Sequence, residues 1–160
     1  MMRAGDYQHR LEVLLAAYHI TLIQVENNEP IPGSYWGEPE AGLIGTRVFF
    51  RADTPVHSVL HEACHVICMH PFRRSALHAD AGGATDEEDA VCYLQILLAD
   101  TLGIQRKSLM EDMDHWGYSF RLGSAREWFE NDAEDARRWL AERGLIDSDH
   151  QPIPALRMAS

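Results

Sequence analysis

The stretch SVLHEACHVICMH, residues 58–70, decides how the rest of the sequence is interpreted. It places His61 and His65 four positions apart with Glu62 between them, in a run that is otherwise uncharged. Residues four apart on an α-helix share one face, so both imidazoles can bind one cation. Glu62 is rotated by about 100° from His61 and can reach a water on that cation without binding the cation itself. The spacing therefore predicts His61 and His65 as metal ligands and Glu62 as the catalytic base.

A purely structural interpretation of the stretch remains open. In it, His61 and His65 are hydrogen-bonded core residues and Glu62 forms a salt bridge. Four apolar residues fall on the helix side opposite the histidines, namely Leu60, Ala63, Val66 and Ile67. A helix buried on that side keeps an unpaired carboxylate only at a cost in free energy, which favours the metal site.

A third metal ligand is expected, because catalytic zinc sites commonly use three protein ligands and one open position. The segment TDEEDAVCYLQILLAD, residues 85–100, contains the best candidates. Glu87 opens the apolar stripe of a helix that begins there, and a carboxylate aimed into a core needs a cation. We therefore expect Glu87 as the third ligand and keep Glu88 as the alternative. The acids could instead serve only the helix N-terminus through its dipole, and His70 and His78 are weaker candidates.

The hydrophobic pattern predicts a small sheet and a largely helical chain. Expected strands are 19–25 and 45–53, and expected helices are 7–18, 54–70, 86–102, 105–115, 125–131 and 133–143. Residues 27–42 are rich in Pro, Gly and Asn and predict a long loop that covers part of the molecule. Capping boxes are expected where Thr85 precedes Glu88 and where Ser124 precedes Glu127. We expect one metal-binding domain over residues 1–147 and a flexible tail over 148–160.

Composition limits the classes of function. The chain of 160 residues has 14 basic and 25 acidic side chains, a net charge of −11. This balance argues against a general nucleic-acid or anionic-membrane binder and favours neutral or basic partners. No signal peptide and no apolar run of about 20 residues is found, so a cytoplasmic protein is expected. Cys64, Cys68 and Cys92 are expected to be reduced and packed as small apolar groups.

The HEACH motif followed by Glu87-x-x-Ala90 resembles the zincin metallopeptidases that use a glutamate as third ligand. The resemblance implies an α+β, zincin-like fold in which a small mixed sheet packs on an active-site helix and a second ligand helix, with a helical C-terminal part. It also implies one zinc ion on His61, His65 and Glu87. Val91 stands where many of these proteins have the Asp or Asn that orients a histidine. Possible substitutes for that residue are Glu26, Asp100 and Asp114.

A second resemblance covers roughly residues 20–103. The order NNEPIP (27–32), TRVFF (46–50), HExxH and then Arg73-Arg74 is similar to the elongation factor P hydroxylase family. That family implies the same metal ligands, holding iron, and hydroxylation of a modified lysine on a translation factor. A His₂Glu site can hold zinc for hydrolysis or iron for oxygen chemistry.

The leading functional prediction is a metal-dependent hydrolase, a metallopeptidase, that acts on a peptide or protein. The first alternative is a metal-dependent protein hydroxylase, and the second is a metal-binding interaction domain without catalysis. Residues 47–51 could form the strand at the edge of a substrate cleft or an ordinary core strand. Arg73 and Arg74 could meet an acidic substrate or balance surface charge. Three further groups could stabilise an oxyanion or simply pack in the core: Tyr35, His115 and Tyr118.

Overall fold

The computed structural model describes residues 1–158, and within them the chain forms three strands and seven α-helices of an α+β domain. The strands are β1 (Thr21–Gln24), β2 (Gly42–Ile44) and β3 (Arg47–Phe50). The helices are α1 (Gln8–Ala16), α2 (Val56–Cys68), α3 (Pro71–Arg74), α4 (Thr85–Leu98), α5 (Arg106–Trp116), α6 (Ala125–Asn131) and α7 (Glu134–Glu142). Short 3₁₀ turns lie at Ala4–Tyr7 and Asp100–Leu102. Every helix predicted from the sequence is present, with ends shifted by a few residues.

The sheet is small and mixed, with the strand order β1-β3-β2. The central strand β3 runs parallel to β1 and antiparallel to β2. Its residues Val48, Phe49 and Phe50 are buried, so of the two alternatives for residues 47–51 the structure has the core strand, which ends at Phe50. Strand β2 is not among the predicted strands. It is only three residues long, Gly42 belongs to the predicted loop, and the predicted strand begins at Gly45.

The outer edge of β2 is already occupied by the chain itself. Leu43 donates its N–H to the carbonyl of Gly33 at 3.0 Å and accepts the N–H of Ala79 at 2.7 Å. A peptide substrate therefore finds no open edge on β2 for strand addition.

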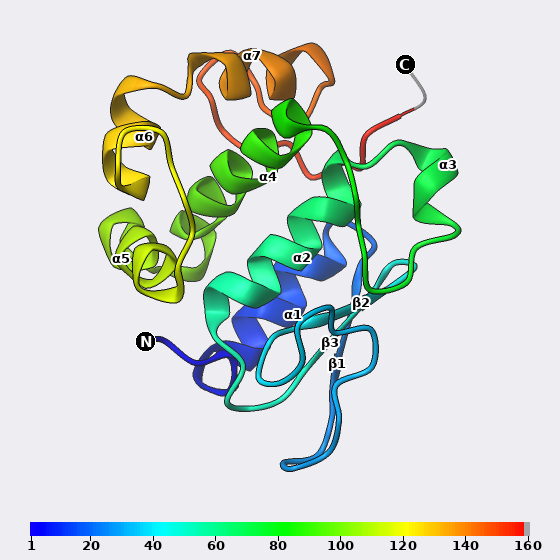
Figure 1. Cartoon of the computed structure of the whole chain (residues 1–160). Helices are drawn as coiled ribbons and strands as arrows, with labels where there is room; N and C mark the ends of the chain where they lie inside the picture. Colours follow the sequence, from blue (N-terminus) through cyan, green and yellow to red (C-terminus); the bar gives the residue numbers. More distant parts are fainter. Residues whose placement is uncertain (159–160) are drawn as a thin grey trace.

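Helix α2 lies in the middle of the domain, between the sheet and α4 (Figure 1). It begins after Pro55, whose backbone is extended. It ends at Cys68 because the next two residues, Met69 and His70, are extended and Pro71 follows. The residue before a proline is disfavoured in helical conformation, so the sequence sets this end of the helix. The result is a buried helix that presents His61 and His65 to α4 and Ser58 to the loop before β2.

Helix α4 packs against α2 and α7, and glycines end two of the neighbouring segments. Gly103 and Gly144 have φ of 73° and 70°, a left-handed conformation that glycine adopts without steric cost. The expected box at Thr85 does not form, because the helix already begins at Thr85 and Ala84 is its N-cap. The expected cap at Ser124 does form, since its hydroxyl accepts the Glu127 N–H at 3.2 Å.

The segment 148–158, which we expected to be flexible, is bonded to the domain. Ile153 donates its N–H to Leu145 at 2.9 Å, and Arg157 donates its N–H to the Ile67 carbonyl at 2.8 Å. The guanidinium of Arg157 also reaches the carbonyl of Cys68 at 3.2 Å. Composition gives no sign of this attachment, because the carbonyls at the end of α2 are far away in the sequence. Residues 159–160 of the expected tail lie outside the described part of the chain.

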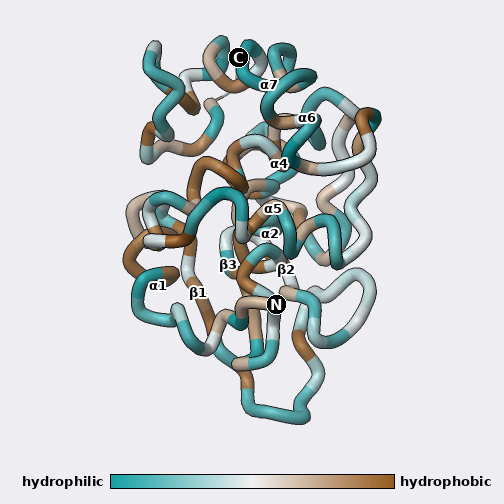
Figure 2. The backbone as a smooth tube through the Cα atoms, turned by 90° about the vertical axis from the view of Figure 1, so that its left-hand side faces the viewer, coloured by the Kyte–Doolittle hydropathy of each residue, from teal (hydrophilic) through white to brown (hydrophobic). Residues whose placement is uncertain are grey.

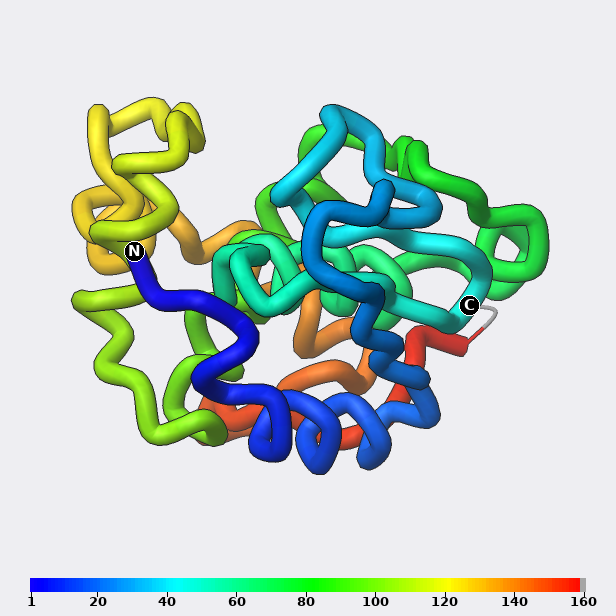
Figure 3. Tube along the Cα trace, turned by 90° about the horizontal axis from the view of Figure 1, so that it is seen from below, coloured from blue at the N-terminus to red at the C-terminus, as the bar shows by residue number. Residues whose placement is uncertain are grey.

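The loop after β1 and the first and last described residues lie at the periphery of the molecule (Figure 1). The loop that follows β1 projects from the body of the molecule and is hydrophilic at its tip (Figure 2). The N-terminus and the C-terminal segment lie at opposite sides (Figure 3). Over residues 1–158, no helix is both long enough and apolar enough to span a membrane.

Candidate metal centre

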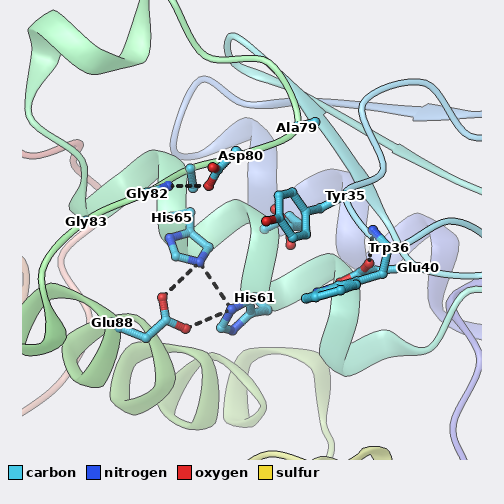
Figure 4. A pocket seen from close by; sticks show the side chains of 12 residues that line it. Tyr35, Trp36, Glu40, His61, His65, Ala79, Asp80, Gly82, Gly83 and Glu88 are labelled. Atoms are coloured by element: carbon cyan, nitrogen blue, oxygen red, sulfur yellow. Dashed lines mark hydrogen bonds and ion pairs between the residues drawn. The ribbon is translucent and has the colours of Figure 1, made fainter.

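The two histidines of the HEACH motif meet one carboxylate of α4. His61 and His65 place their Nε2 atoms 3.1 Å apart on the face of α2 that is turned toward α4 (Figure 4). The two oxygens of Glu88 lie 3.1 Å from His61 Nε2 and 3.3 Å from His65 Nε2. All three ligand atoms fall within 4.8 Å of one another. Two imidazole nitrogens and one carboxylate oxygen that converge in this way form a donor set suited to zinc or iron.

Glu87, the expected third ligand, lies elsewhere, and Glu88 takes its place beside the histidines. The Glu87 carboxylate accepts two hydrogen bonds from Arg73, at 2.9 and 3.0 Å, and is 3.4 Å from Arg157. It is buried, and Gly83 passes so close that a Cβ there would overlap the carboxylate. Glu87 therefore does point inward, as the sequence indicates, but its cations are two arginines.

The choice between the two acids depends on the rotation of α4 about its axis. Adjacent residues on a helix point about 100° apart, so only one can face the histidines. The apolar pattern does not fix this angle, because α4 is buried on every side from Ala90 to Leu98. The informative signal is polar: Glu88, Cys92 and Gln95 share one face at intervals of four and three, and Gln95 is a polar residue inside an apolar run.

Gln95 connects that face of α4 to α2. It is fully buried, and its Oε1 lies 2.9 Å from His61 Nδ1. Its Nε2 donates to the His57 carbonyl at 2.8 Å and to the Tyr118 hydroxyl at 3.1 Å. The Tyr118 hydroxyl also lies 3.1 Å from His57 Nδ1. Sequence reasoning did not single out Gln95, although it left the residue that orients a histidine unassigned.

Glu62, the expected base, lines the same cavity as His61, His65 and Glu88. Its side chain is only 8% exposed, and no group among residues 1–158 forms a hydrogen bond or ion pair with its carboxylate. Burial, with the neighbouring Glu40 and Glu88, raises the pKa of Glu62 to about 7. The salt bridge of the structural interpretation is therefore not formed within the described chain.

The histidines of α2 differ in their electrostatics. Burial, aided by the charge of His61, lowers the pKa of His65 to about 3 and that of His57 likewise. Burial also acts to lower the pKa of His61, but Tyr118, Cys92 and Glu88 outweigh it and raise this pKa well above its ordinary value. The neighbours of His61 therefore favour protonation of this ring, whereas burial disfavours it at His57 and His65.

Two cavities open on either side of the cluster and share Trp36, Glu40, His61 and Glu88. The first, of about 300 Å³, contains Glu62 and is bounded by the loop of residues 79–83. The second, of about 580 Å³, extends toward Trp116, Tyr118 and Phe120. Tyr35 and Trp36, from the loop that was predicted to cover part of the molecule, line the first cavity and stand opposite Glu88 in Figure 4.

The other residues that the sequence offered as ligands, or as partners that orient a histidine, lie away from the cluster. Glu26 is exposed in a loop, Asp100 pairs with Arg106 at 2.7 Å, and Asp114 accepts the Ala125 N–H at 2.8 Å. Those three do not reach the histidines. His70 accepts the Phe72 N–H at 3.2 Å, and His78 and His115 are exposed.

Arg74 is also used inside the molecule. It donates to the carbonyl of Val66 at 3.0 Å and to that of Met69 at 2.7 Å. It therefore stabilises the end of α2, as Arg73 stabilises the start of α4 through Glu87.

Comparison with protein-family models, with curated proteins and with solved structures finds no match for this chain. The function has to be argued from the geometry of the cluster.

Proposed function

We propose that the chain is a metal-dependent hydrolase that acts on a peptide or protein, with His61, His65 and Glu88 as the metal ligands. The observation that carries the proposal is Glu62. Glu62 is only 8% exposed and its carboxylate has no partner among residues 1–158, which is costly, and it lines the same cavity as the three proposed ligands. Metal-assisted hydrolysis gives it a purpose, because the reaction needs a base next to the metal.

The donor set fits one divalent ion. The Nε2 atoms of His61 and His65 face each other at 3.1 Å, and both face Glu88. Without an ion, this arrangement places two nitrogens against each other with at most one proton to share. An ion between the three groups satisfies all of them at once. Zinc is the metal we propose, since His₂Glu ligation with an open position is common in catalytic zinc sites.

A bound ion would act as a Lewis acid that makes a water molecule acidic near neutral pH. Glu62 would take the proton from the attacking water and return it to the leaving amine. Tyr118 is a poor candidate for the oxyanion, because its hydroxyl lies between Gln95 and His57. Tyr35 is exposed and lines the cavity beside Glu62, so of the residues considered it is the better oxyanion donor.

The shape and charge of the cleft favour an extended neutral or basic peptide. The two cavities lie on either side of His61 and Glu88, so neighbouring side chains of one substrate could enter one each. Among the described residues, no lysine or arginine lines either cavity, whereas Glu40, Asp80 and Asp89 do. Aromatic walls at Trp36 and Trp116 suit apolar or cationic side chains.

The zincin-like fold belongs to the same proposal. It is supported by the placement of HExxH on α2 and of a ligand glutamate at the start of α4, the helix packed on it. A cytoplasmic location also stays a prediction. The hydroxylase alternative is compatible with the same donor set, because two histidines and one carboxylate also hold iron in oxygenases.

Metal content and peptide cleavage together test the proposal. We expect the full chain, purified without added metal, to contain about one zinc per chain and to cleave members of a peptide library. Glu62→Gln should keep the zinc and lose at least about 100-fold in kcat, the lower range for a general base. Stoichiometric iron without zinc and without cleavage would overturn the hydrolase and favour the hydroxylase. Full cleavage by Glu62→Gln would remove Glu62 from the mechanism.

A further inference from the structure

The amide of Gln95 has only one possible orientation. Its Nε2 end lies 2.8 Å from the backbone carbonyl of His57. A carbonyl oxygen only accepts hydrogen bonds, so the amide group that faces it must be the NH₂. A reversed amide would place two carbonyl oxygens in contact inside a fully buried site, which is unfavourable. Oε1 is therefore the end that faces His61.

This orientation fixes the proton on the imidazole of His61. Gln95 Oε1 lies 2.9 Å from His61 Nδ1 and can only accept. Nδ1 must therefore carry a hydrogen in every protonation state that keeps this bond. When the ring holds a single proton, Nε2 is left with its lone pair, and Nε2 is the atom that faces Glu88 and His65.

Tyr118 closes the arrangement on the far side. Its hydroxyl accepts from Gln95 Nε2 at 3.1 Å, so its own hydrogen is free for His57 Nδ1, also at 3.1 Å. The chain of hydrogen bonds thus begins at His61, passes through Gln95 and Tyr118, and returns to α2 at His57. Gln95 is held at both ends by the same helix that carries the metal ligands.

The two ligand histidines differ in this respect. His65 Nδ1 is buried and has no hydrogen-bond partner within residues 1–158. Metal-binding histidines commonly donate their other N–H to an acceptor, and loss of that acceptor weakens metal binding about 10- to 100-fold. Among residues 1–158 only His61 of these two has such an acceptor, so Gln95 carries the whole effect there.

We infer that Gln95 is the positioning residue of the metal centre: its amide oxygen holds the His61 proton on Nδ1 and keeps Nε2 available to the metal. The inference rests on the proposed metal site, but the state of the His61 ring is a property of the protein itself. In the metallopeptidases that the sequence resembles, an Asp or Asn at the position of Val91 often orients a ligand histidine. Val91 cannot form that hydrogen bond, and the inference gives this role to the neutral amide of Gln95, one turn later on α4.

Two variants of Gln95 separate positioning from simple packing. Gln95→Leu keeps a similar volume and removes the acceptor, so zinc affinity should fall about 10- to 100-fold. Gln95→Glu keeps an acceptor for His61 but loses the donor to His57, so it should bind zinc within about threefold of the unaltered protein while unfolding more easily. If Gln95 only filled space, Gln95→Leu would bind zinc more tightly than Gln95→Glu. Tyr118→Phe, which leaves the His61 bond intact, is the matched control.

The measurements are zinc affinity of the full chain, by competition with a chromophoric chelator, and the ¹⁵N spectrum of the His61 ring. In the metal-free protein, at a pH where the ring is neutral, we expect a protonated Nδ1 and an unprotonated Nε2. A proton on Nε2 there, or Gln95→Leu binding zinc as tightly as the unaltered protein, would overturn the inference. If Gln95→Leu does not fold, the ring spectrum and Gln95→Glu still decide. If the unaltered protein binds no zinc, the proposed function is wrong. The ring spectrum of the metal-free protein tests only the inference about Gln95, so the two failures can be told apart.

Discussion

Two neighbouring carboxylates at the start of α4 have opposite partners. Glu87 is buried and paired with the guanidinium groups of Arg73 and Arg157. Glu88 is 45% exposed at its side chain and faces the imidazoles of His61 and His65. The first carboxylate is compensated by permanent charges of the protein. The second faces two imidazoles and could share a metal ion with them, so under the proposed function Glu87 is structural and Glu88 is a metal ligand.

The largest expected effect is on metal affinity. Glu88→Gln should weaken zinc binding by at least about 100-fold. Loss of a residue that only hydrogen-bonds a ligand weakens metal binding by up to about 100-fold, and Glu88 is proposed to contact the metal directly. Glu87→Gln, one residue away, should leave zinc affinity within about threefold of the unaltered protein. Competition with a chromophoric chelator measures both. Equal losses in the two variants would mean that Glu87 and Glu88 do not have separate roles.

For the stability of the fold, Glu87→Gln should have the larger effect and Glu88→Gln the smaller one. Glu87→Gln removes the buried charge that the guanidinium groups of Arg73 and Arg157 face, and we expect the free energy of unfolding to drop by about 2–3 kcal/mol. The effect should lie below the roughly 3–5 kcal/mol of a fully buried pair, because Arg73 is 37% exposed. Glu88→Gln in metal-free protein should change it by less than about 1 kcal/mol, since the group is partly exposed. Urea titration with chelator present measures the two values, and a larger loss for Glu88→Gln would contradict the assignment.

The sequence predicts most of this architecture but leaves the choice between the two acids open. The HExxH spacing, Pro71 and the glycines after the helices are local signals, and the helices they define are present. Glu87 and Glu88 differ only by the rotation of α4, which depends on how a helix buried on all sides packs against α2. The partner of Glu87 at Arg157 is set by the path of the C-terminal segment, and this is a long-range contact that no local pattern contains.

The histidine region should also govern the response to acid. Burial lowers the pKa of His57 to about 3 in the folded protein, from 6.5. Below pH 6.5 the unfolded chain binds a proton that the folded chain refuses, so stability falls as the pH drops from 6.5 toward 3. One such group contributes about 1.4 kcal/mol per pH unit. His57→Asn, whose amide oxygen can still accept from Tyr118, should reduce the slope by about this amount in metal-free protein.

Urea titrations at several pH values between 6.5 and 4 measure that slope. Tyr118→Phe keeps His57 buried, so its slope should remain close to that of the unaltered protein. An unchanged slope in His57→Asn would show that His57 is not held neutral by the fold.

The smallest expected effect concerns substrate binding and uses two exposed aromatic residues. Trp36, 79% exposed, lines both cavities beside Glu88, whereas Phe72, 83% exposed, lies on α3 next to Arg73, the partner of Glu87, and lines neither cavity. Trp36→Ala should raise the KM for a cleaved peptide about three- to tenfold, equivalent to about 1 kcal/mol of lost aromatic contact, with kcat little changed. Phe72→Ala should leave both constants as they are. The opposite result, a higher KM for Phe72→Ala and an unchanged KM for Trp36→Ala, would contradict this placement. It would mean that the peptide binds along α3, near Glu87, and not in the cavities beside Glu88.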